Sequence, residues 1–365
     1  MKFSLKLIMG HFLSIKKYFF VSFFIFLPSY FSLALDVSKC ELIGVYFGTC
    51  ISNLPKVEKL SQKGINAVVV DVKNDDGQIL WSSNEVKEKI VKFINELKEK
   101  NIYTIARIVA FKDKKKTREN KKWAICNRDG SLYVDKEKMS WLNPYNENVQ
   151  NYLIDLGKAA INIGFDEVQY DYIRFSAYKS LNNTQLGKIF AQKSRVEVIN
   201  EFLEKATDVI HGEGGKISVD VFGCIIPELF HGWENNANAL GQNYEQIANI
   251  VDFICPMIYP SHFPYGFMSA RDVVLQNGKI KKITFSAPDL FPYEIIKESL
   301  IASNKNVDKS KVRPWLQCFS AKWLGAGKWK RYTASDVQKQ INATTDNEIS
   351  QCCLWNPAIN YTILG

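Results

Sequence analysis

The sequence predicts a single-domain (β/α)8 barrel, because two patterns alternate along the chain after residue 40. Short segments rich in β-branched and aromatic residues alternate with longer amphipathic stretches, which is typical of parallel strands joined by crossover helices. Eight such units over about 320 residues fit a barrel of this kind with insertions. The eight predicted strands are 41–48, 66–73, 103–111, 165–175, 216–224, 251–260, 312–320 and 351–357.

Helical periodicity between these segments supports the same α/β fold class. In 84–100 the apolar residues recur three and four positions apart, as on one face of a helix. Residues 146–164 begin with an asparagine suited to capping and end near Gly164, and 193–210 and 245–250 repeat the pattern. A doubly wound open sheet is the alternative, but no glycine-rich nucleotide-binding motif follows the first predicted strand.

The N-terminus predicts export of the chain. Residues 1–34 contain four lysines and no acidic residue, and 18–35 contain no charged residue at all. A basic start, an apolar run and the small residues Ser32 and Ala34 are typical of a secretory signal peptide, so cleavage after Ala34 is expected. An uncleaved signal anchor is the alternative, because the run approaches the length that spans a bilayer. The predicted domains are this signal and a barrel over 41–361, in the periplasm or outside the cell.

The charge of the chain does not indicate a nucleic-acid partner. The 365 residues include 47 Lys and Arg against 38 Asp and Glu, a formal net charge of +9. Part of this excess belongs to the export signal, and part lies in the lysine-rich segment 112–122, which suits an anionic glycan or envelope surface. No nucleic-acid recognition motif is present. We also expect no cofactor and no metal, while the oligomeric state is not predicted.

Eight cysteines, an even number, permit disulfides in an exported protein. Cys40 and Cys50 flank one apolar segment and are the best local candidates for a pair. The cysteines inside apolar, strand-like runs are expected to be buried free thiols.

Carboxylates at the ends of neighbouring strands are the candidate catalytic groups. Alternate residues of a barrel strand point inward, and in the fourth predicted strand Glu167 and Asp171 share the face expected to do so. The same reasoning places Asp220 of the fifth strand beside Asp171, and the second strand carries Asp71. Paired inward carboxylates are what glycoside hydrolysis requires, with one acting as acid and the other attacking or activating water. A structural salt bridge is the alternative role for each of them.

Further side chains are expected to complete the site. Arg107 and Arg174 are predicted to neutralise the buried carboxylates, which are costly to bury without partners. Aromatic residues near strand ends are expected to form platforms for sugar rings, although packing is the alternative role for any single tryptophan. The predicted substrate-binding residues are Asp71, Arg107, Glu167, Arg174, Tyr259, His262, Gln317 and Trp355.

Seven motifs follow one another along the barrel region. They are VVVDVKNDDG (68–77), ARIVAFKD (106–113), GFDEVQYDYIRF (164–175), SVDVFG (218–223), PMIYPSH (256–262), RPWLQCF (313–319) and LWNP (354–357). As a set they resemble the bacterial putative glycoside hydrolase domain family. The resemblance covers 41–361 and implies a secreted TIM barrel that is distantly related to α-amylase-like glycosidases and acts on a carbohydrate.

The resemblance to α-amylase-like barrels makes Asp171 the nucleophile and seeks the general acid after the fifth strand. The sequence departs from that pattern, because the strand offers Asp220, with Glu228 further along, where those enzymes carry a glutamate. Chitinase-like barrels instead end their fourth strand in a glutamate. The acid and the nucleophile therefore stay unassigned among these three residues. The expected function is cleavage of a polysaccharide or envelope glycan, and a non-catalytic carbohydrate-binding protein on a degenerate barrel is the alternative.

Overall fold

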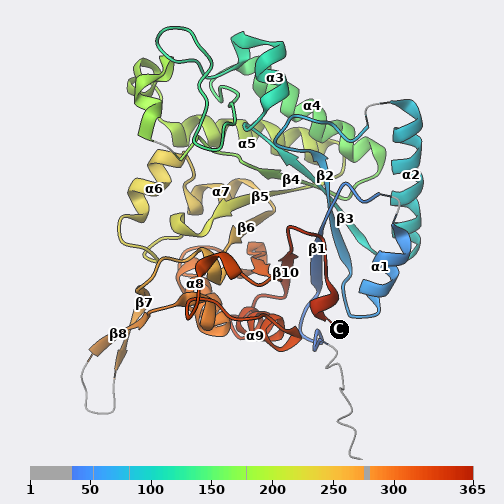
Figure 1. The fold of residues 1–365 in the computed structure, drawn as a ribbon. Coiled ribbons are helices and arrows are strands. Elements are labelled where there is room, and N and C mark those ends of the chain that lie inside the picture. The colour runs from blue at the N-terminus through green and yellow to red at the C-terminus, as the bar shows by residue number, and fades with distance from the viewer. Residues whose placement is uncertain (1–34, 52, 82, 178, 275–279, 365) are drawn as a thin grey trace, which may run out of the picture. The chain divides into compact units, whose positions relative to one another are not determined.

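Eight parallel strands close into a barrel in the computed structural model, which describes residues 35–364 except 52, 82, 178 and 275–279 (Figure 1). The predicted signal segment 1–34 lies outside the described residues. The barrel strands are β1 (Leu42–Gly48), β2 (Ala67–Lys73), β3 (Tyr103–Val109), β4 (Glu167–Asp171), β5 (Lys216–Phe222), β6 (Phe253–Met257), β9 (Trp315–Gln317) and β10 (Gln351–Trp355).

These strands are the eight that the sequence predicted. They run around the barrel in chain order, and β10 pairs with β1 to close it. The pairing of β6 with β9 is short, with the named strands in register only at Met257 and Trp315. The prediction of a (β/α)8 TIM barrel is confirmed.

Helices cover the outside of the barrel (Figure 1). They are α1 (Leu54–Ser61), α2 (Asn84–Glu99), α3 (Lys114–Glu119), α4 (Glu147–Ile163), α5 (Arg195–Gly212), α6 (Trp233–Leu240), α7 (Tyr244–Ile250), α8 (Pro292–Ser303) and α9 (Ala334–Thr345). The four predicted helices correspond to α2, α4, α5 and α7. The Asn146 side chain accepts a hydrogen bond from the backbone N–H of Asn148 at the start of α4, and Gly164 ends that helix at a φ of 119°.

The two faces of β4 divide as the alternation predicted. Tyr170 points outward, and its hydroxyl donates to the backbone carbonyl of Leu153 in α4. A Cβ at Gly157 would lie 2.6 Å from that hydroxyl oxygen, so the glycine permits the close approach of α4 to β4. Glu167 and Asp171 belong to the opposite face, which points into the barrel.

Apolar side chains fill part of the barrel interior. An apolar cluster there includes Val69, Ile105, Cys255 and Trp315. All eight cysteines lie within the described residues and are free thiols, so the expected pair between Cys40 and Cys50 is not formed. The prediction of that disulfide is not supported by the structure.

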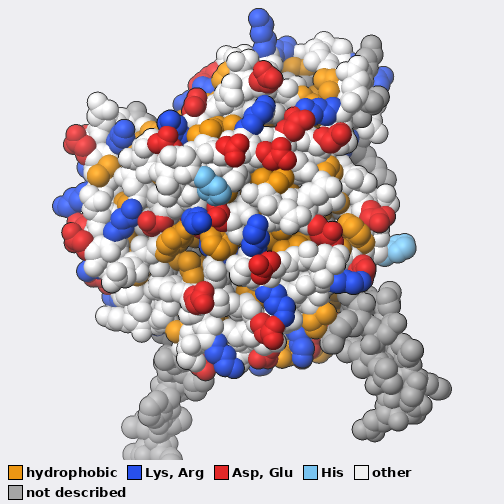
Figure 2. All heavy atoms as spheres, turned by 180° about the vertical axis from the view of Figure 1, so that it is seen from behind, with side chains coloured by type: hydrophobic (Ala, Val, Ile, Leu, Met, Phe, Trp, Pro, Cys, Tyr) orange, Lys and Arg blue, Asp and Glu red, His pale blue; other side chains and the backbone are white. Residues whose placement is uncertain are grey.

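A hairpin between β6 and β9 was not predicted. Its strands β7 (Phe267–Val274) and β8 (Ile280–Phe285) are antiparallel and project away from the barrel (Figure 1). On the face seen in Figure 2, basic and acidic side chains are interspersed over the surface. Within the part of the chain that the structure describes, no helix has the length and apolar character needed to cross a membrane.

Candidate active site

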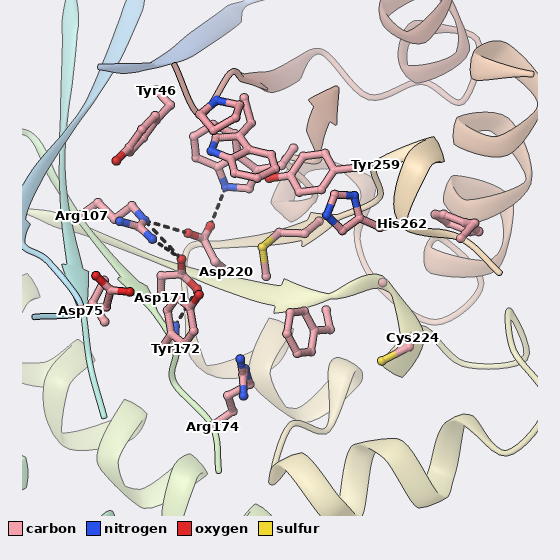
Figure 3. A pocket seen from close by; sticks show the side chains of 18 of the residues that line it. Tyr46, Asp75, Arg107, Asp171, Tyr172, Arg174, Asp220, Cys224, Tyr259 and His262 are labelled. Atoms are coloured by element: carbon pink, nitrogen blue, oxygen red, sulfur yellow. Dashed lines mark hydrogen bonds and ion pairs between the residues drawn. The ribbon is translucent and has the colours of Figure 1, made fainter. Parts of the chain in front are cut away.

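A cavity of about 710 Å³ opens at the carboxyl ends of the barrel strands (Figure 3). Its walls carry four carboxylates, two guanidinium groups and a larger set of aromatic and apolar side chains. The cavity therefore lies where barrels of this kind place their active sites, and its volume is in the range of small-ligand sites.

One wall of the cavity is charged and consists of Asp71, Arg107, Asp171 and Asp220. Arg107 lies at the centre of this charged wall (Figure 3). It lies on β3 opposite Asp71 of β2, and its Nη1 donates to Asp71 Oδ1 at 2.6 Å. Its Nη2 and Nε both donate to Asp171 Oδ2, at 2.5 and 3.2 Å, and its Nε lies 3.9 Å from Asp220 Oδ2. Burial opposes the charged guanidinium, but the attraction of these three aspartates outweighs it and holds the pKa of Arg107 well above its usual value.

Asp220 is the most enclosed carboxyl of the cavity, with 2% of the residue exposed. Its Oδ1 accepts a hydrogen bond from Trp315 Nε1 at 2.6 Å. Burial and the nearby charge of Asp171 raise the pKa of Asp220 well above its usual value, although Arg107 and the Trp315 bond act in the opposite direction. Asp220 is therefore suited to hold a proton at a pH where an exposed aspartate would be ionised.

Asp171 ends β4 at a sharp turn of the backbone. Its Oδ1 accepts from the backbone N–H of Tyr172 at 2.6 Å, while its Oδ2 is bound by Arg107. Tyr172 has a φ of 50°, a conformation that is uncommon for a bulky residue and that occurs preferentially at functional sites. Both oxygens of Asp171 thus accept hydrogen bonds, which fix the orientation of the carboxyl group.

Tyr46 of β1 closes the charged wall on the side of Asp71. Its hydroxyl donates to Asp71 Oδ2 at 2.5 Å. Burial and the neighbouring Asp71 carboxylate raise the pKa of the Tyr46 hydroxyl, which therefore remains a donor. The sequence analysis missed Tyr46, although the alternation of the first strand would have placed it on the inward face.

An aromatic wall faces the carboxylates. The rings of Tyr259 and Trp355 lie 4.7 Å apart between centroids with an interplanar angle of 32°, and His262 lies 5.3 Å from Tyr259. Burial lowers the pKa of His262, so its imidazole is favoured in the neutral form. The three residues were predicted at this site, and the structure brings them together in the cavity wall, where Figure 3 labels Tyr259 and His262.

The cavity brings together eight of the eleven predicted site residues. They are Asp71, Arg107, Asp171, Arg174, Asp220, Tyr259, His262 and Trp355. The residues that do not line it are Glu167, Gln317 and Glu228.

Each of those three is engaged elsewhere. Glu167 lies fully buried, where Arg313 Nη1 donates to both of its carboxylate oxygens at 2.8 and 2.9 Å. Gln317 is also buried, and its side chain bonds to the backbone N–H of Ser261 and to Asp289. The structure thus places both residues outside the cavity lining, with their polar atoms bonded to other protein groups.

Glu228 is the third exception. It follows β5 in the chain, but its backbone turns at a φ of 60° and its carboxylate pairs with Lys305. More than half of each of these two side chains is exposed to solvent. Glu228 therefore lies outside the cavity, whereas Asp171 and Asp220 both line it.

One of the two arginines that were predicted to neutralise the buried carboxylates forms such an ion pair, and the other does not. Arg107 neutralises Asp171, as expected. Arg174 forms no ion pair with Asp171 or Glu167, and the partner of Glu167 is Arg313, which the sequence analysis did not single out. Among the residues that the structure describes, no group of three or more His, Cys, Asp or Glu side chains is arranged to hold a metal ion.

The comparison with known families now bears on this site. The family model described as a putative glycosyl hydrolase domain matches residues 51–361. The chain belongs to this family. No curated protein matches the sequence of this glycosyl hydrolase domain. The family assignment supports the predicted glycoside hydrolase activity.

Solved structures share the fold of this glycosyl hydrolase domain. A class V chitinase from Pseudomonas fluorescens Pf-5 superposes with a TM-score of 0.52 at 12% identity, covering 88% of this chain and 98% of its own. The Bacillus cereus spore cortex-lytic enzyme SleL gives 0.51 at 11% identity, covering 88% and 73%. A hypothetical protein from Ruminiclostridium thermocellum ATCC 27405 is 31% identical over 48% of this chain and 97% of its own, with a TM-score of 0.41.

Proposed function

We propose that this glycosyl hydrolase domain cleaves a polysaccharide or envelope glycan by a two-carboxylate mechanism that uses Asp171 and Asp220. The observation that carries the proposal is the convergence of these two carboxyl groups on Arg107, at the ends of neighbouring strands and inside one cavity. Two carboxyl groups with different tendencies to ionise, on either side of a glycosidic bond, are the minimum that this chemistry requires.

Asp220 acts as the general acid in this proposal. Its raised pKa keeps a proton on the carboxyl group, which it donates to the leaving oxygen as the glycosidic bond breaks. The bond from Trp315 Nε1 to Oδ1 fixes the orientation of the group and leaves Oδ2 on the side of Arg107. The acid is thus an aspartate on β5 rather than Glu228.

Asp171 acts as the ionised carboxylate. Its charge opposes the positive charge that develops on the sugar in an oxocarbenium-like transition state. The Asp171 and Asp220 oxygens that face Arg107 both lie near its Nε, at 3.2 and 3.9 Å, so they cannot be further apart than these distances together. Retained configuration in the product would make Asp171 the nucleophile, and inverted configuration would make it the base that activates water.

The aromatic wall supplies a platform for the sugar ring. Tyr259 and Trp355 both line the cavity with their ring centroids 4.7 Å apart, and an aromatic ring there can pack against the apolar face of a pyranose while its hydroxyl groups meet the charged wall.

Screening the purified chain against peptidoglycan and common polysaccharides tests the proposal. Asp171→Asn and Asp220→Asn are assayed beside the wild type, with Glu228→Gln as the matched control because it also converts a carboxylate to an amide, outside the cavity. We expect each of the first two to lose about 10²- to 10⁴-fold in turnover and the control to keep wild-type turnover. Glycan binding without turnover in the wild type would instead establish the non-catalytic alternative.

We also propose that the chain is exported to the periplasm or the cell exterior. The support is the sequence of residues 1–34, with its basic start and apolar run. Determining the N-terminus of the protein from fractionated cells tests this proposal, and we expect it to begin at Leu35 after cleavage. An intact Met1 in the membrane fraction would establish the anchored form, and an intact chain in the cytoplasm would refute export.

A further inference from the structure

Arg174 differs from the other buried arginines of the barrel. Arg107 and Arg313 each form an ion pair with at least one carboxylate at 2.8 Å or less. Arg174 lines the cavity with 8% of the residue exposed, and among the described residues it forms no ion pair. The fold therefore places a positive charge in the cavity wall with no carboxylate of the described residues at ion-pair distance.

The donors of this guanidinium are only partly used. Its Nη1 donates to the backbone carbonyl of Phe175 at 3.0 Å, and no other hydrogen bond from Arg174 is found among the described residues. An arginine carries five N–H donors in a planar fork and is always protonated in proteins. No Arg174 nitrogen is among the fully buried polar atoms of the described chain that lack a partner, so its unbonded donors face the open cavity, where a ligand can bond to them.

Aromatic rings hold Arg174 in place. Its guanidinium carbon lies 5.1, 4.9 and 4.4 Å from the ring centroids of Trp141, Tyr172 and Phe222. Such contacts stabilise a cation and immobilise it, but they leave its edge donors free. Burial lowers the pKa of Arg174 from its usual value, in contrast to the raised pKa of Arg107, because the attraction of Tyr172, Asp171 and Glu137 offsets only part of the lost solvation.

The position of Arg174 relates it to the proposed chemistry. It follows Asp171 by three residues and lies beside Tyr172 on the wall of the cavity (Figure 3). The carboxylates of the cavity form ion pairs with other cations, because Asp71 and Asp171 are bound by Arg107, and Asp75 lies 3.5 Å from Lys112. A substituent on a sugar held at Asp171 is therefore within the same cavity as the free edge of Arg174.

We propose that Arg174 binds an oxyanion substituent of the glycan, a carboxylate or a phosphate ester, so that the substrate of this site is an acidic glycan. This inference rests on the proposed function, because that function identifies the ligand as a glycan. The planar fork of arginine matches either oxyanion with two parallel hydrogen bonds, which neutral sugar hydroxyls do not provide. The aromatic rings around Arg174 exclude water and strengthen such a pair.

Binding measured by calorimetry tests this assignment separately from turnover. All proteins carry Asp171→Asn, so that the glycan is not consumed. The probes are polygalacturonate, peptidoglycan glycan strands and polyglycerol-phosphate teichoic acid. The two carboxylate polymers are each paired with a counterpart whose carboxyl groups have been reduced to alcohols, and the teichoic acid distinguishes phosphate from carboxylate as the ligand.

We expect Arg174→Gln to weaken the binding of at least one acidic polymer by about 10- to 100-fold. For a carboxylate polymer, reduction of its carboxyl groups to alcohols should weaken its binding to the protein that retains Arg174 by about the same factor. That measurement does not depend on the folding of the Arg174→Gln variant. Arg174→Lys, which keeps the charge but loses the fork, should lie between the two. Arg118→Gln is the matched control, because it removes one exposed arginine from the lysine-rich segment, and it should bind like the parent.

Two results would overturn the assignment. One is the failure of every acidic polymer to bind. The other is binding that changes less than about twofold with both Arg174→Gln and ligand reduction, or that falls equally with Arg118→Gln, which would indicate a general effect of charge. An acidic polymer that binds through Arg174 but is not hydrolysed by the wild type would refute the proposed function and leave this assignment intact.

Discussion

Removing one hydrogen-bond donor from Asp220 should shift the pH dependence of the enzyme in a known direction. Trp315→Phe deletes the indole N–H that donates to Asp220 Oδ1 at 2.6 Å and retains an aromatic ring in the barrel interior. That bond favours the ionised form of Asp220, so its loss raises the pKa of a carboxyl group that burial already holds well above its usual value.

The size of the shift follows from the strength of the bond. A hydrogen bond to a charged group contributes about 1.5–3 kcal/mol and one to a neutral group about 0.5–1.5 kcal/mol. The two protonation states of Asp220 therefore differ by about 1–1.5 kcal/mol in what they gain from Trp315, which corresponds to roughly one pKa unit. Because the general acid must be protonated, its activity persists to higher pH when its pKa rises.

The assay is the pH dependence of kcat/KM on a cleaved glycan. We expect the alkaline limb for Trp315→Phe to lie about one pH unit above that of the wild type. Trp355→Phe is the matched control, since Trp355 also lines the cavity but forms no hydrogen bond with Asp220; its alkaline limb should stay in place even if KM rises. An alkaline limb that moves to lower pH, or that moves equally in both variants, would refute the assignment of Asp220 as the acid.

Three further substitutions test the charge arrangement. Arg107→Gln leaves buried carboxylates without their cation and should lower the free energy of unfolding by about 3–5 kcal/mol at pH 7. The loss should be smaller in acid, where the carboxyl groups are protonated. Urea denaturation at several pH values measures the free energy of unfolding under both conditions. Arg313→Met should cost a similar amount because it orphans Glu167, and adding Glu167→Gln should restore part of the loss in a double-mutant cycle. Glu228→Ala should change stability by no more than about 1 kcal/mol, because its pair with Lys305 is exposed.

The barrel could be predicted because its strands are buried on both faces. Such strands appear in the sequence as segments rich in apolar residues, although β4 and β5 also carry the inward carboxylates Glu167, Asp171 and Asp220. The hairpin of β7 and β8 escaped prediction because it lies outside the barrel. Among its residues whose side chains the structure describes, only the end residues Phe267 and Phe285 are buried, so it leaves no comparable pattern.

The inward direction of Asp171 and Asp220 could also be predicted, since the alternation along a strand is a local property. The identity of their partners could not. Arg313 and Glu167 are 146 positions apart in the sequence and meet across the barrel interior. This pairing depends on how the closed sheet is staggered. Glu228 shows the same limit, because the backbone turn that sends it to the surface has no clear signal in its neighbours.

The most direct test of the two-carboxylate account compares substrates that differ only in their leaving group. A glycan that the enzyme cleaves is assayed beside a dinitrophenyl glycoside of the same sugar, whose leaving group needs no protonation. We expect Asp220→Asn to lose activity on the glycan but keep much of it on the dinitrophenyl glycoside, and Asp171→Asn to lose activity on both. Full activity of either variant on the glycan, or the reverse pattern between the two variants, would contradict the account.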